Sequence, residues 1–478
     1  MIKLRFSILL AILTTAFSTL MAQQITGAFA NKPRPKGNLF RQVPVFRSKG
    51  DSIKIAEAER LLIIASNVRQ SDAKFGDSVR TLYSSLVDVG IIRYRKLYSS
   101  IRGFGSTKEF ISFDSMLKQP DKSTVTYLTI TSKKMRKLPS EILQCSNLQE
   151  LEIINSKLRK IQPELNHLSS LKKITIANNL SKRPLKLSRN THVTQLNIHG
   201  DRASSLPRSY KNFEALTKLN IAENGLKKFP NGARYNKNLK ELDLQYNDIT
   251  LKENNIEPHP GLERLSLQYN NIQYVPSSIK NVSDLKKLSL NYNEITDAAP
   301  EINTLQNLEY ISFYNNKLTT IPSGVYGIKS LMYIDLFYNQ LTKLDERIAN
   351  WPNLQILYIS HNQLSSLPEA ISKIDSLKEI HAYNNLLTEL PTSLCRLPKL
   401  KILRVNVNLL DELPACFPVF TELEELDFSD NNIKHFPPEI INFKNLRLLV
   451  VSINPWQNPA DVKKVADVAR SRGAVVHD

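Results

Sequence analysis

The sequence predicts an α/β solenoid, a fold in which short repeats stack in one direction, and three observations predict it. First, one pattern recurs every 23 residues from Val125 to the C-terminus, with clear copies at 262–284 and 354–376. Second, each copy opens with apolar residues at period two, which is typical of a strand with one buried face. Third, an Asn, a Pro and a wider apolar spacing follow, which indicate a turn and a return segment. Because one repeat cannot bury its own apolar face, neighbouring repeats must stack into one continuous core.

The copies share the skeleton LxxLxLxxNxLxxLPxxIxxLxx, and fourteen full repeats precede a truncated last one. Each step between repeats is 23 residues, except for the step of 22 from Leu171 to Val193. Positions within a repeat are counted from its first residue. These first residues are Val125, Leu148, Leu171, Val193, Leu216, Leu239, Leu262, Leu285, Leu308, Leu331, Leu354, Leu377, Leu400, Leu423 and Leu446.

This skeleton resembles the leucine-rich repeat family, specifically the 23-residue class that has LPxxIxxL on its convex side. That class occurs in bacterial cell-surface proteins and in eukaryotic Ras-pathway scaffolds. The resemblance covers about three quarters of the chain. It implies a right-handed, horseshoe-shaped solenoid with a parallel β-sheet along the concave face.

An Asn stands at position nine in twelve of the fifteen repeats, and we expect it to be structural. Its amide carries donors and an acceptor, so stacked Asn side chains can satisfy backbone groups where each strand turns away. The Pro at position fifteen, as in Pro276, Pro322, Pro368, Pro391, Pro414 and Pro437, fixes φ and ends the strand region. The expected ladder consists of Asn179, Asn224, Asn247, Asn270, Asn293, Asn316, Asn339, Asn362, Asn385, Asn408, Asn431 and Asn454.

Residues 1–22 look like a secretory signal peptide, with Lys3 and Arg5 ahead of an apolar stretch and a cleavage point after Ala22. A membrane anchor is the alternative, but the apolar run is short and is interrupted by Thr and Ser. We therefore expect an exported protein that has no membrane span after signal cleavage. Its compartment would be periplasmic, cell-surface or secreted.

Two further segments precede the repeats. Residues 23–50 hold several Pro, Gly and basic residues without a period, which indicates a flexible basic leader. Residues 51–124 form a helical N-terminal region or cap, and its third, short helix would hold Phe110, Phe113 and Leu117 behind a capping box of Ser106 and Glu109. These helices would cover the open edge of the first repeat, although a separate module over 51–105 fits as well.

The repeats occupy 125–454, and residues 455–478 are expected to form a C-terminal cap. A helix would begin at Pro459 and run through Arg470, and a short strand would follow at 474–477. Both elements would shield the last repeat.

Charge is distributed unevenly along the chain, whose net charge is +19. Residues 23–240 hold 40 Lys and Arg against 16 Asp and Glu, whereas residues 241–478 hold 22 against 29. The basic half would attract an acidic surface, an anionic glycan or lipid headgroups. A solvated basic face without a dedicated partner is the alternative. Nucleic acid is not expected, because the charge is accompanied by no recognition motif.

Three cysteines are too few for a disulfide framework. Cys145 falls at a buried position of its repeat and is most simply a core residue. Cys395 and Cys416 fall in adjacent repeats, close enough for a bond that spacing alone leaves open.

The sequence has no phosphate-binding GxxxxGKS loop, no HExxH and no nucleophile elbow. We therefore predict no enzyme, no catalytic residue, no metal site and no cofactor.

The positions expected to be exposed on the concave sheet are two, three, five, seven and eight, because strand alternation turns three, five and seven away from the core. Mixed charges at these positions would form a rim suited to a protein partner. They are Asp243, Glu263, Arg264, Lys286, Lys287, Glu309, Asp335, Lys378, Glu379 and Arg404. Aromatic residues gather there too, and nine of the seventeen tyrosines lie on this surface. The candidate partner-binding residues are Tyr246, Tyr269, Tyr292, Tyr310, Tyr314, Tyr333, Phe337, Tyr338, Tyr358, His361, His381 and Tyr383.

Tyrosine offers a large contact area at low entropic cost and is enriched at binding hot spots. The first hypothesis is therefore a recognition protein that binds a protein partner through this face. The second is a binder of a glycan or an anionic envelope polymer, which would use the same rings and the basic N-terminal half. The third is an architectural envelope component. A purely structural explanation also exists, in which the rings stack on each other and simply cover the sheet.

Overall fold

The computed structural model describes residues 110–131, 135–177, 179, 185–199, 208–230, 234–252, 255–420 and 422–478. The expected signal peptide, the basic leader and the helices expected before Phe110 lie outside these residues. The chain divides into two compact units, Met1–Lys108 and Glu109–Asp478, and every described residue belongs to the second.

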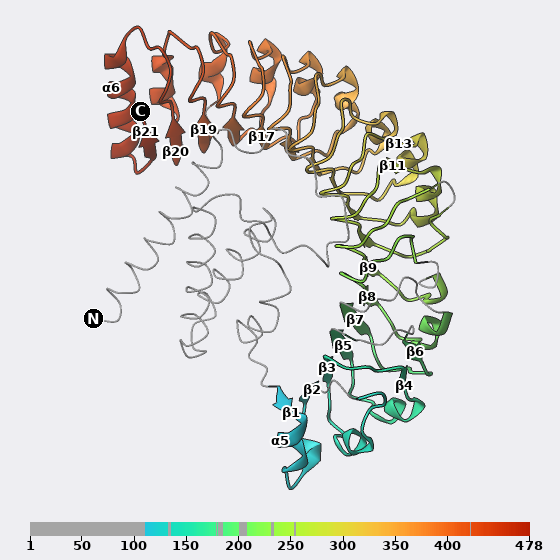
Figure 1. Ribbon diagram of the computed structural model, residues 1–478. Coiled ribbons are helices and arrows are strands. Elements are labelled where there is room, and N and C mark those ends of the chain that lie inside the picture. Colours follow the sequence, from blue (N-terminus) through green and yellow to red (C-terminus); the bar gives the residue numbers. More distant parts are fainter. Residues whose placement is uncertain are drawn as a thin grey trace, which may run out of the picture. The chain divides into compact units, whose positions relative to one another are not determined.

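The second unit is a curved solenoid whose inner side is one parallel sheet of seventeen short strands (Figure 1). Strands of this sheet pair with their neighbours in chain order, and the register advances by one repeat at each step, as in Leu242↔Leu265↔Leu288. The short repeat is visible as the pairing Lys173↔Gln195. The predicted leucine-rich repeat solenoid with a concave parallel sheet is therefore confirmed.

The strands of the concave sheet are β1 (Ile111–Ser112), β2 (Tyr127–Thr131), β3 (Glu150–Ile154), β5 (Lys173–Ala177), β7 (Gln195–His199), β8 (Lys218–Asn220), β9 (Glu241–Asp243), β10 (Arg264–Ser266), β12 (Lys287–Ser289), β14 (Tyr310–Ser312), β15 (Tyr333–Asp335), β16 (Ile356–Tyr358), β17 (Glu379–His381), β18 (Ile402–Arg404), β19 (Glu425–Asp427), β20 (Leu448–Val450) and β21 (Val475–His477). From β8 to β20 each strand of this sheet is three residues long, at positions three to five. Position four, as in Leu265 and Ile311, is buried in the core, and the residues on either side of it face outward.

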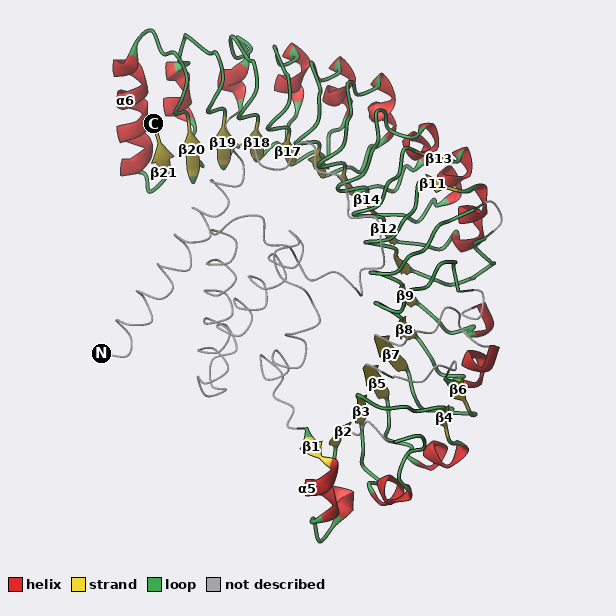
Figure 2. Cartoon of the chain, viewed as in Figure 1, coloured by secondary structure: helices red, strands yellow, loops and turns green. Residues whose placement is uncertain are grey.

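The outer side of the solenoid carries short 3-10 helices, one in most repeats (Figure 2). The Pro at position fifteen often starts them, because its fixed φ suits the residue before the first turn; Pro276, Pro322 and Pro368 are such N-caps. These helices are η2 (Lys122–Thr124), η3 (Ser140–Gln144), η4 (Pro163–His167), η5 (Arg208–Asn212), η7 (Ser277–Val282), η8 (Pro300–Thr304), η9 (Ser323–Gly327), η10 (Glu346–Asn350), η11 (Glu369–Lys373), η12 (Thr392–Arg396), η13 (Phe417–Val419) and η14 (Pro438–Asn442). Two small parallel pairs, β4 (Lys160–Ile161) with β6 (Lys186–Leu187) and β11 (Tyr274–Val275) with β13 (Asp297–Ala298), lie outside the concave sheet.

The expected Asn ladder is present. The amide nitrogen of Asn270 donates to the carbonyls of Leu244 and Leu267, each at 3.0 Å, and its Oδ1 accepts from the backbone N–H of Ile249 at 2.9 Å. The same three contacts recur from Asn293 to Asn431, so each amide satisfies backbone groups of two repeats. The ladder Asn thus links the turns of neighbouring repeats through their backbone groups.

The residue before each ladder Asn has a left-handed backbone. In every repeat where position eight is described, φ lies between 50° and 61°. This conformation turns the chain sharply, so that position nine points inward directly after a strand whose side chains alternate. The four tyrosines at position eight, Tyr246, Tyr269, Tyr292 and Tyr338, all adopt it, which the sequence analysis did not foresee.

Both ends of the described solenoid are covered. At the start, helix α5 (Phe113–Leu117) buries Met116, and the cap of this helix is Ser112, whose hydroxyl accepts from the N–H of Ser115 at 3.1 Å. The prediction that Phe110 belongs to this helix was wrong, because Phe110 lies before β1. The helix begins later because the capping oxygen comes from Ser112, directly before Phe113. At the other end, the expected helix and strand are present as α6 (Pro459–Ser471) and β21.

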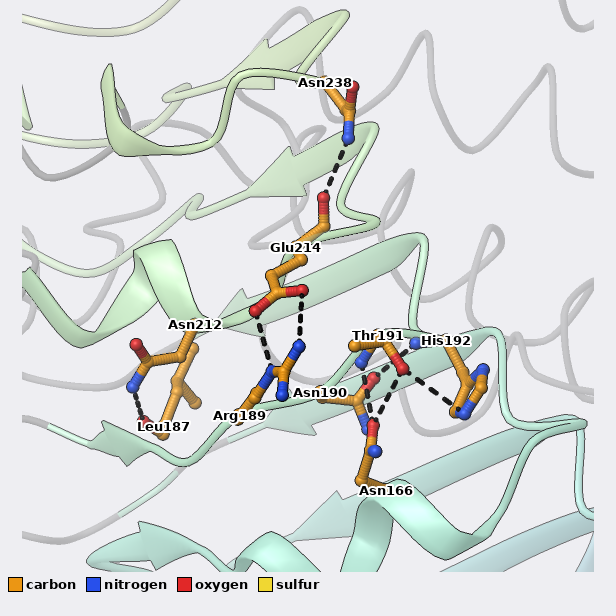
Figure 3. A network of polar contacts seen from close by, with 9 residues as sticks. All are labelled: Asn166, Leu187, Arg189, Asn190, Thr191, His192, Asn212, Glu214 and Asn238. Atoms are coloured by element: carbon orange, nitrogen blue, oxygen red, sulfur yellow. Dashed lines mark hydrogen bonds and ion pairs between the residues drawn. The ribbon is translucent and has the colours of Figure 1, made fainter.

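The irregular repeats near the 22-residue step are linked by polar contacts (Figure 3). Arg189 pairs with Glu214 of the next repeat at 2.9 Å, and the backbone N–H of Thr191 donates to Asn166 of the preceding repeat at 2.8 Å. Amide side chains such as Asn212 donate to backbone carbonyls in the same region. The contacts of Asn166 and Asn212 satisfy backbone groups that the regular ladder does not reach.

One of the three cysteines is free and buried, and the other two form a disulfide. Cys145 is fully buried, and burial raises the pKa of its thiol. Cys395 and Cys416 form a disulfide across adjacent repeats, with Cα atoms 6.0 Å apart. The bond that spacing alone left open is thus present.

Candidate partner-binding surface

The candidate aromatic residues form two rows on the concave side of the solenoid. The first, here called the turn row, lies at positions seven and eight; the second, the strand row, lies at positions three and five. All twelve residues singled out in the sequence belong to one row or the other. The turn row is Tyr246, Tyr269, Tyr292, Tyr314, Phe337, Tyr338, His361 and Tyr383, and the strand row is Tyr310, Tyr333, Tyr358 and His381.

Rings of the turn row contact each other from one repeat to the next. Tyr246, Tyr269 and Tyr292 are stacked face to face, with centroids 4.3 and 4.1 Å apart. Tyr292 then meets Tyr314 at 5.0 Å, and Tyr338 stacks on His361 at 4.1 Å. The regularity follows from the left-handed position eight, which presents each ring at the same angle one repeat further along.

The strand row runs beside it across four strands. Tyr310 and Tyr333 are stacked at 4.5 Å, Tyr333 and Tyr358 are tilted at 5.3 Å, and Tyr358 is stacked on His381 at 4.3 Å. Lys287 closes the N-terminal end of the row, because its ammonium lies 4.2 Å from the centre of the Tyr310 ring. This row therefore begins with a cation–π contact within the protein itself.

Stacking covers much of these rings, so they are less exposed than the sequence analysis expected. All the aromatic residues of the two rows are half-buried except His381, which is buried. Its burial follows from the Tyr358 ring on one side and the neighbouring strand on the other. The rings therefore cover part of the sheet, and their remaining faces and edges form two aromatic rows, each linked by ring contacts and together called the aromatic surface.

Burial governs the ionisation of this surface. It raises the pKa of Tyr310 to about 12 and raises the pKa values of Tyr314, Tyr333 and Tyr383 as well, so the hydroxyls stay protonated. It also lowers the pKa of His361 to about 4. The rows are thus electrically neutral near pH 7.

The two histidines differ in their partners. The amide of Asn384 donates to Nδ1 of His361 at 2.8 Å, which requires that this nitrogen be unprotonated. Nε2 of His381 lies 3.2 Å from the carboxylate of Glu379. Burial lowers the pKa of His381, although this carboxylate opposes the shift.

Charged residues at positions two and three pair across repeats. Glu263 lies between Lys240 at 3.1 Å and Lys286 at 3.2 Å, and Glu241 likewise contacts Lys218 and Arg264. Such exposed pairs contribute about 0–1 kcal/mol each. They nevertheless neutralise part of the rim that the sequence analysis assigned to a partner, namely Glu263, Arg264 and Lys286.

Sequence reasoning missed the serines at position five. Ser312 stands between Tyr310 at position three and Tyr314 at position seven, and it is fully buried where its hydroxyl donates to Asp335 at 2.9 Å. Comparison of position five along the repeats would have found it, since Ser266 and Ser289 precede it there. In this repeat the serine places one hydrogen-bonding group between the two rows.

Among the described residues, no group of three or more His, Cys, Asp or Glu side chains is placed to hold a metal ion. In the same part of the chain, no helix has both the length and the apolar character needed to cross a bilayer.

Family models for the leucine-rich repeat match residues 214–272, 283–341, 329–387 and 422–443. Leucine-rich repeats are therefore shown within residues 214–443 of this chain. No sequence relative is found among curated proteins.

Three solved structures show the same fold. A leucine-rich repeat protein of Leptospira interrogans is 23% identical with a TM-score of 0.62, and the match covers 78% of this chain and all of that one. The Toll–Spatzle complex of Drosophila matches at 20% identity and a TM-score of 0.59, over 75% of this chain and 55% of that one. The ectodomain of the Arabidopsis thaliana receptor kinase GASSHO1/SCHENGEN3, in complex with CASPARIAN STRIP INTEGRITY FACTOR 2, matches at 24% and 0.53, over 74% and 46%. At these identities the likeness concerns the fold.

Proposed function

We propose that this chain is an exported recognition protein that binds a protein partner through the two aromatic rows and performs no catalysis. The observation that carries the proposal is the aromatic surface of twelve side chains on the concave side, which form two rows of rings in contact from repeat to repeat. Rigid tyrosine rings lose little entropy on binding, and stacking has already fixed those of Tyr246, Tyr269 and Tyr292.

The comparisons support a binding role in general terms. Leucine-rich repeat folds are in general non-catalytic interaction scaffolds, and two of the matched structures are complexes with a second protein or factor. Export is supported by the sequence alone, through the charged start at Lys3 and Arg5 and the apolar stretch that follows.

The backbone at position eight determines how the test is built. Tyr269, Tyr292 and Tyr338 have φ values of 52–54°, which Asn tolerates better than Ala does. Position eight already holds Asn in other repeats, at Asn315 and Asn384. A triple change of the three tyrosines to Asn therefore removes the rings while keeping the turn.

Affinity capture from envelope and extracellular extracts would compare the wild type, this triple variant and a control. The control is Tyr274→Asn, because Tyr274 is an exposed tyrosine on β11, outside the concave sheet. We expect a partner that the wild type and the control retain and the triple variant loses. Binding of that partner should protect the backbone amides between β10 and β17 from hydrogen exchange. Equal capture by a folded triple variant would refute the proposal.

A further inference from the structure

Asp335 is a carboxylate at position five of the concave sheet, and it is only 8% exposed. Two donors reach it: the hydroxyl of Ser312 at 2.9 Å and the backbone N–H of Phe337 at 3.1 Å. It has no ion pair with any residue that the structure describes. A buried ionised carboxylate with so few partners is costly, and such groups gather at functional sites.

The other carboxylates of this column, Asp243 and Asp427, are half-buried and better compensated. Asp243 accepts from the side-chain amides of Asn220 and Gln245, each at 3.1 Å. Asp427 accepts from the hydroxyl of Ser429 at 2.7 Å; burial raises its pKa, and the positive charge of Arg404 opposes that shift. Among the described residues, Asp335 has neither the second side-chain donor of Asp243 nor the nearby cation of Asp427. Its one side-chain donor is the hydroxyl of Ser312.

The surroundings of Asp335 suit a cation. Tyr333 lies on the same strand as Asp335, and Tyr358 is the register partner of Asp335 on the next strand. The ring centroids of Tyr333 and Tyr358 are 5.3 Å apart. Tyrosine faces attract ammonium and guanidinium groups. The same row already holds one cation in this way, since Lys287 lies over the Tyr310 ring.

We propose that Asp335, together with the rings of Tyr333 and Tyr358, anchors a positively charged side chain of the protein partner. This inference rests on the proposed function, and it names the chemistry of the partner at one point of the aromatic surface. The partner's cation would supply the counter-charge that the chain does not provide, and the two rings would cover its apolar stem.

The site has a pH dependence with a definite sign. Burial raises the pKa of Asp335 to about 6. Its titratable neighbours are Tyr310 and Tyr314 from β14 and its turn, Tyr333 from its own strand and Tyr358 from β16, and burial holds all four protonated at this pH. Beyond Tyr358 lie Glu379 and His381 on β17. A bound cation favours the carboxylate, so it lowers the pKa of Asp335, and affinity falls as the pH drops below about 6.

The first test uses the full chain and a small probe, n-butylguanidinium, with neutral n-butylurea as its matched control. Carbon-13 resonances of aspartate carboxyl groups would be followed by NMR, with Asp335 and Asp427 assigned by their loss in Asp335→Asn and Asp427→Asn. We expect n-butylguanidinium to lower the pKa of Asp335 in a saturable manner and to leave Asp427 unchanged. No response, or the same response to n-butylurea, would overturn the proposal. Tyr333→Leu keeps the carboxylate but removes one ring, and it should weaken the response.

The second test uses a partner captured through the aromatic surface. We expect Asp335→Asn to weaken its binding about tenfold or more at pH 7.5 and to abolish the loss of affinity below pH 6, whereas Asp427→Asn changes neither. Unchanged affinity in a folded Asp335→Asn variant would overturn this inference alone. If the triple tyrosine variant also retained the partner, the proposed function itself would fail.

Discussion

Residues at position eight have a left-handed backbone, and five of them also contribute a ring to the turn row. The left-handed conformation suits Asn and Asp, which occur there as Asn155, Asn315, Asn384 and Asp430. It suits β-branched residues poorly, because their second γ substituent crowds the backbone. Ile453, with φ 59°, is nevertheless found at this position in the last repeat and is 73% exposed.

Replacing Ile453 with Asn should therefore stabilise the protein. The exposed isoleucine buries little surface that the change could lose. Relief of the unfavourable backbone conformation is worth about 1 kcal/mol. Urea unfolding would measure the gain, and Ile453→Ala, which keeps a residue ill-suited to this conformation, should give a smaller one. A destabilised Asn variant would show that strain at position eight is unimportant.

His361 makes a second residue-scale prediction, on pH. Its folded-state pKa of about 4 lies below the ordinary value, so the unfolded chain binds more protons and stability falls as the pH drops from about 6.5 to about 4. His361→Asn keeps the left-handed turn and removes this linkage. We expect the variant to lose about 1–2 kcal/mol less than the wild type across that window, after allowance for screening by water. Chemical unfolding at pH 7 and pH 4.5 measures the difference; identical losses would mean that His361 titrates normally.

At the scale of the element, regularity comes from contacts between repeats. Strands of three residues are too short to be stable alone, so neighbouring strands and the 3-10 helices behind them supply the stability. Gly324 in η9 shows how closely the outer helices pack. A Cβ at this residue would lie 2.5 Å from the carbonyl oxygen of Pro300 and 2.8 Å from a methyl group of Ile302.

Gly324→Ala is therefore expected to destabilise the protein by about 1–3 kcal/mol, because the backbone of η8 must move to admit one methyl group. Thermal unfolding would measure the loss. Ser323→Ala is the matched control, since Ser323 is exposed and adjacent. If both changes proved equally mild, the packing between η8 and η9 would be looser than described.

The sequence was informative about these elements in unequal measure. The repeat of Leu at positions one, four and six identifies the strands, and the Asn and Pro identify the turn, because each performs one backbone task. The 3-10 helices and the left-handed position eight were not predicted, since the residue types at position eight vary from Tyr to Val407. The twelve aromatic residues were selected from their repeat positions, of which strand alternation accounts for three, five and seven but not eight. The surroundings of Asp335 depend on contacts from Ser312 and Phe337 that no sequence pattern marks.

At the scale of the whole molecule, a stack of repeats has two open ends. Helix α6 covers the last one and buries Val462 and Val465, while β21 pairs with β20 and satisfies the final strand edge. Exposed strand edges promote association between chains. The elements that cover the ends of the stack are therefore expected to prevent association between chains.

Deletion of residues 458–478 should make the protein associate with itself. It uncovers the β20 edge and the apolar surface under α6. Light scattering after size-exclusion chromatography would show a mass that rises with concentration. Lys464→Ala, on the exposed side of α6, controls for a mere change in charge. A deletion variant that stayed monomeric at all concentrations would contradict this role for α6 and β21.

The left-handed residue at position eight has a consequence for how such a protein could change its ligand. Each repeat contacts mainly its neighbours, and the turn that presents position eight is nearly the same from Asn155 to Ile453. A ring can therefore be added, removed or moved by one repeat without disturbing the fold. The order of side chains from Tyr246 to Tyr383 could therefore be transferred to another solenoid with the same repeat length.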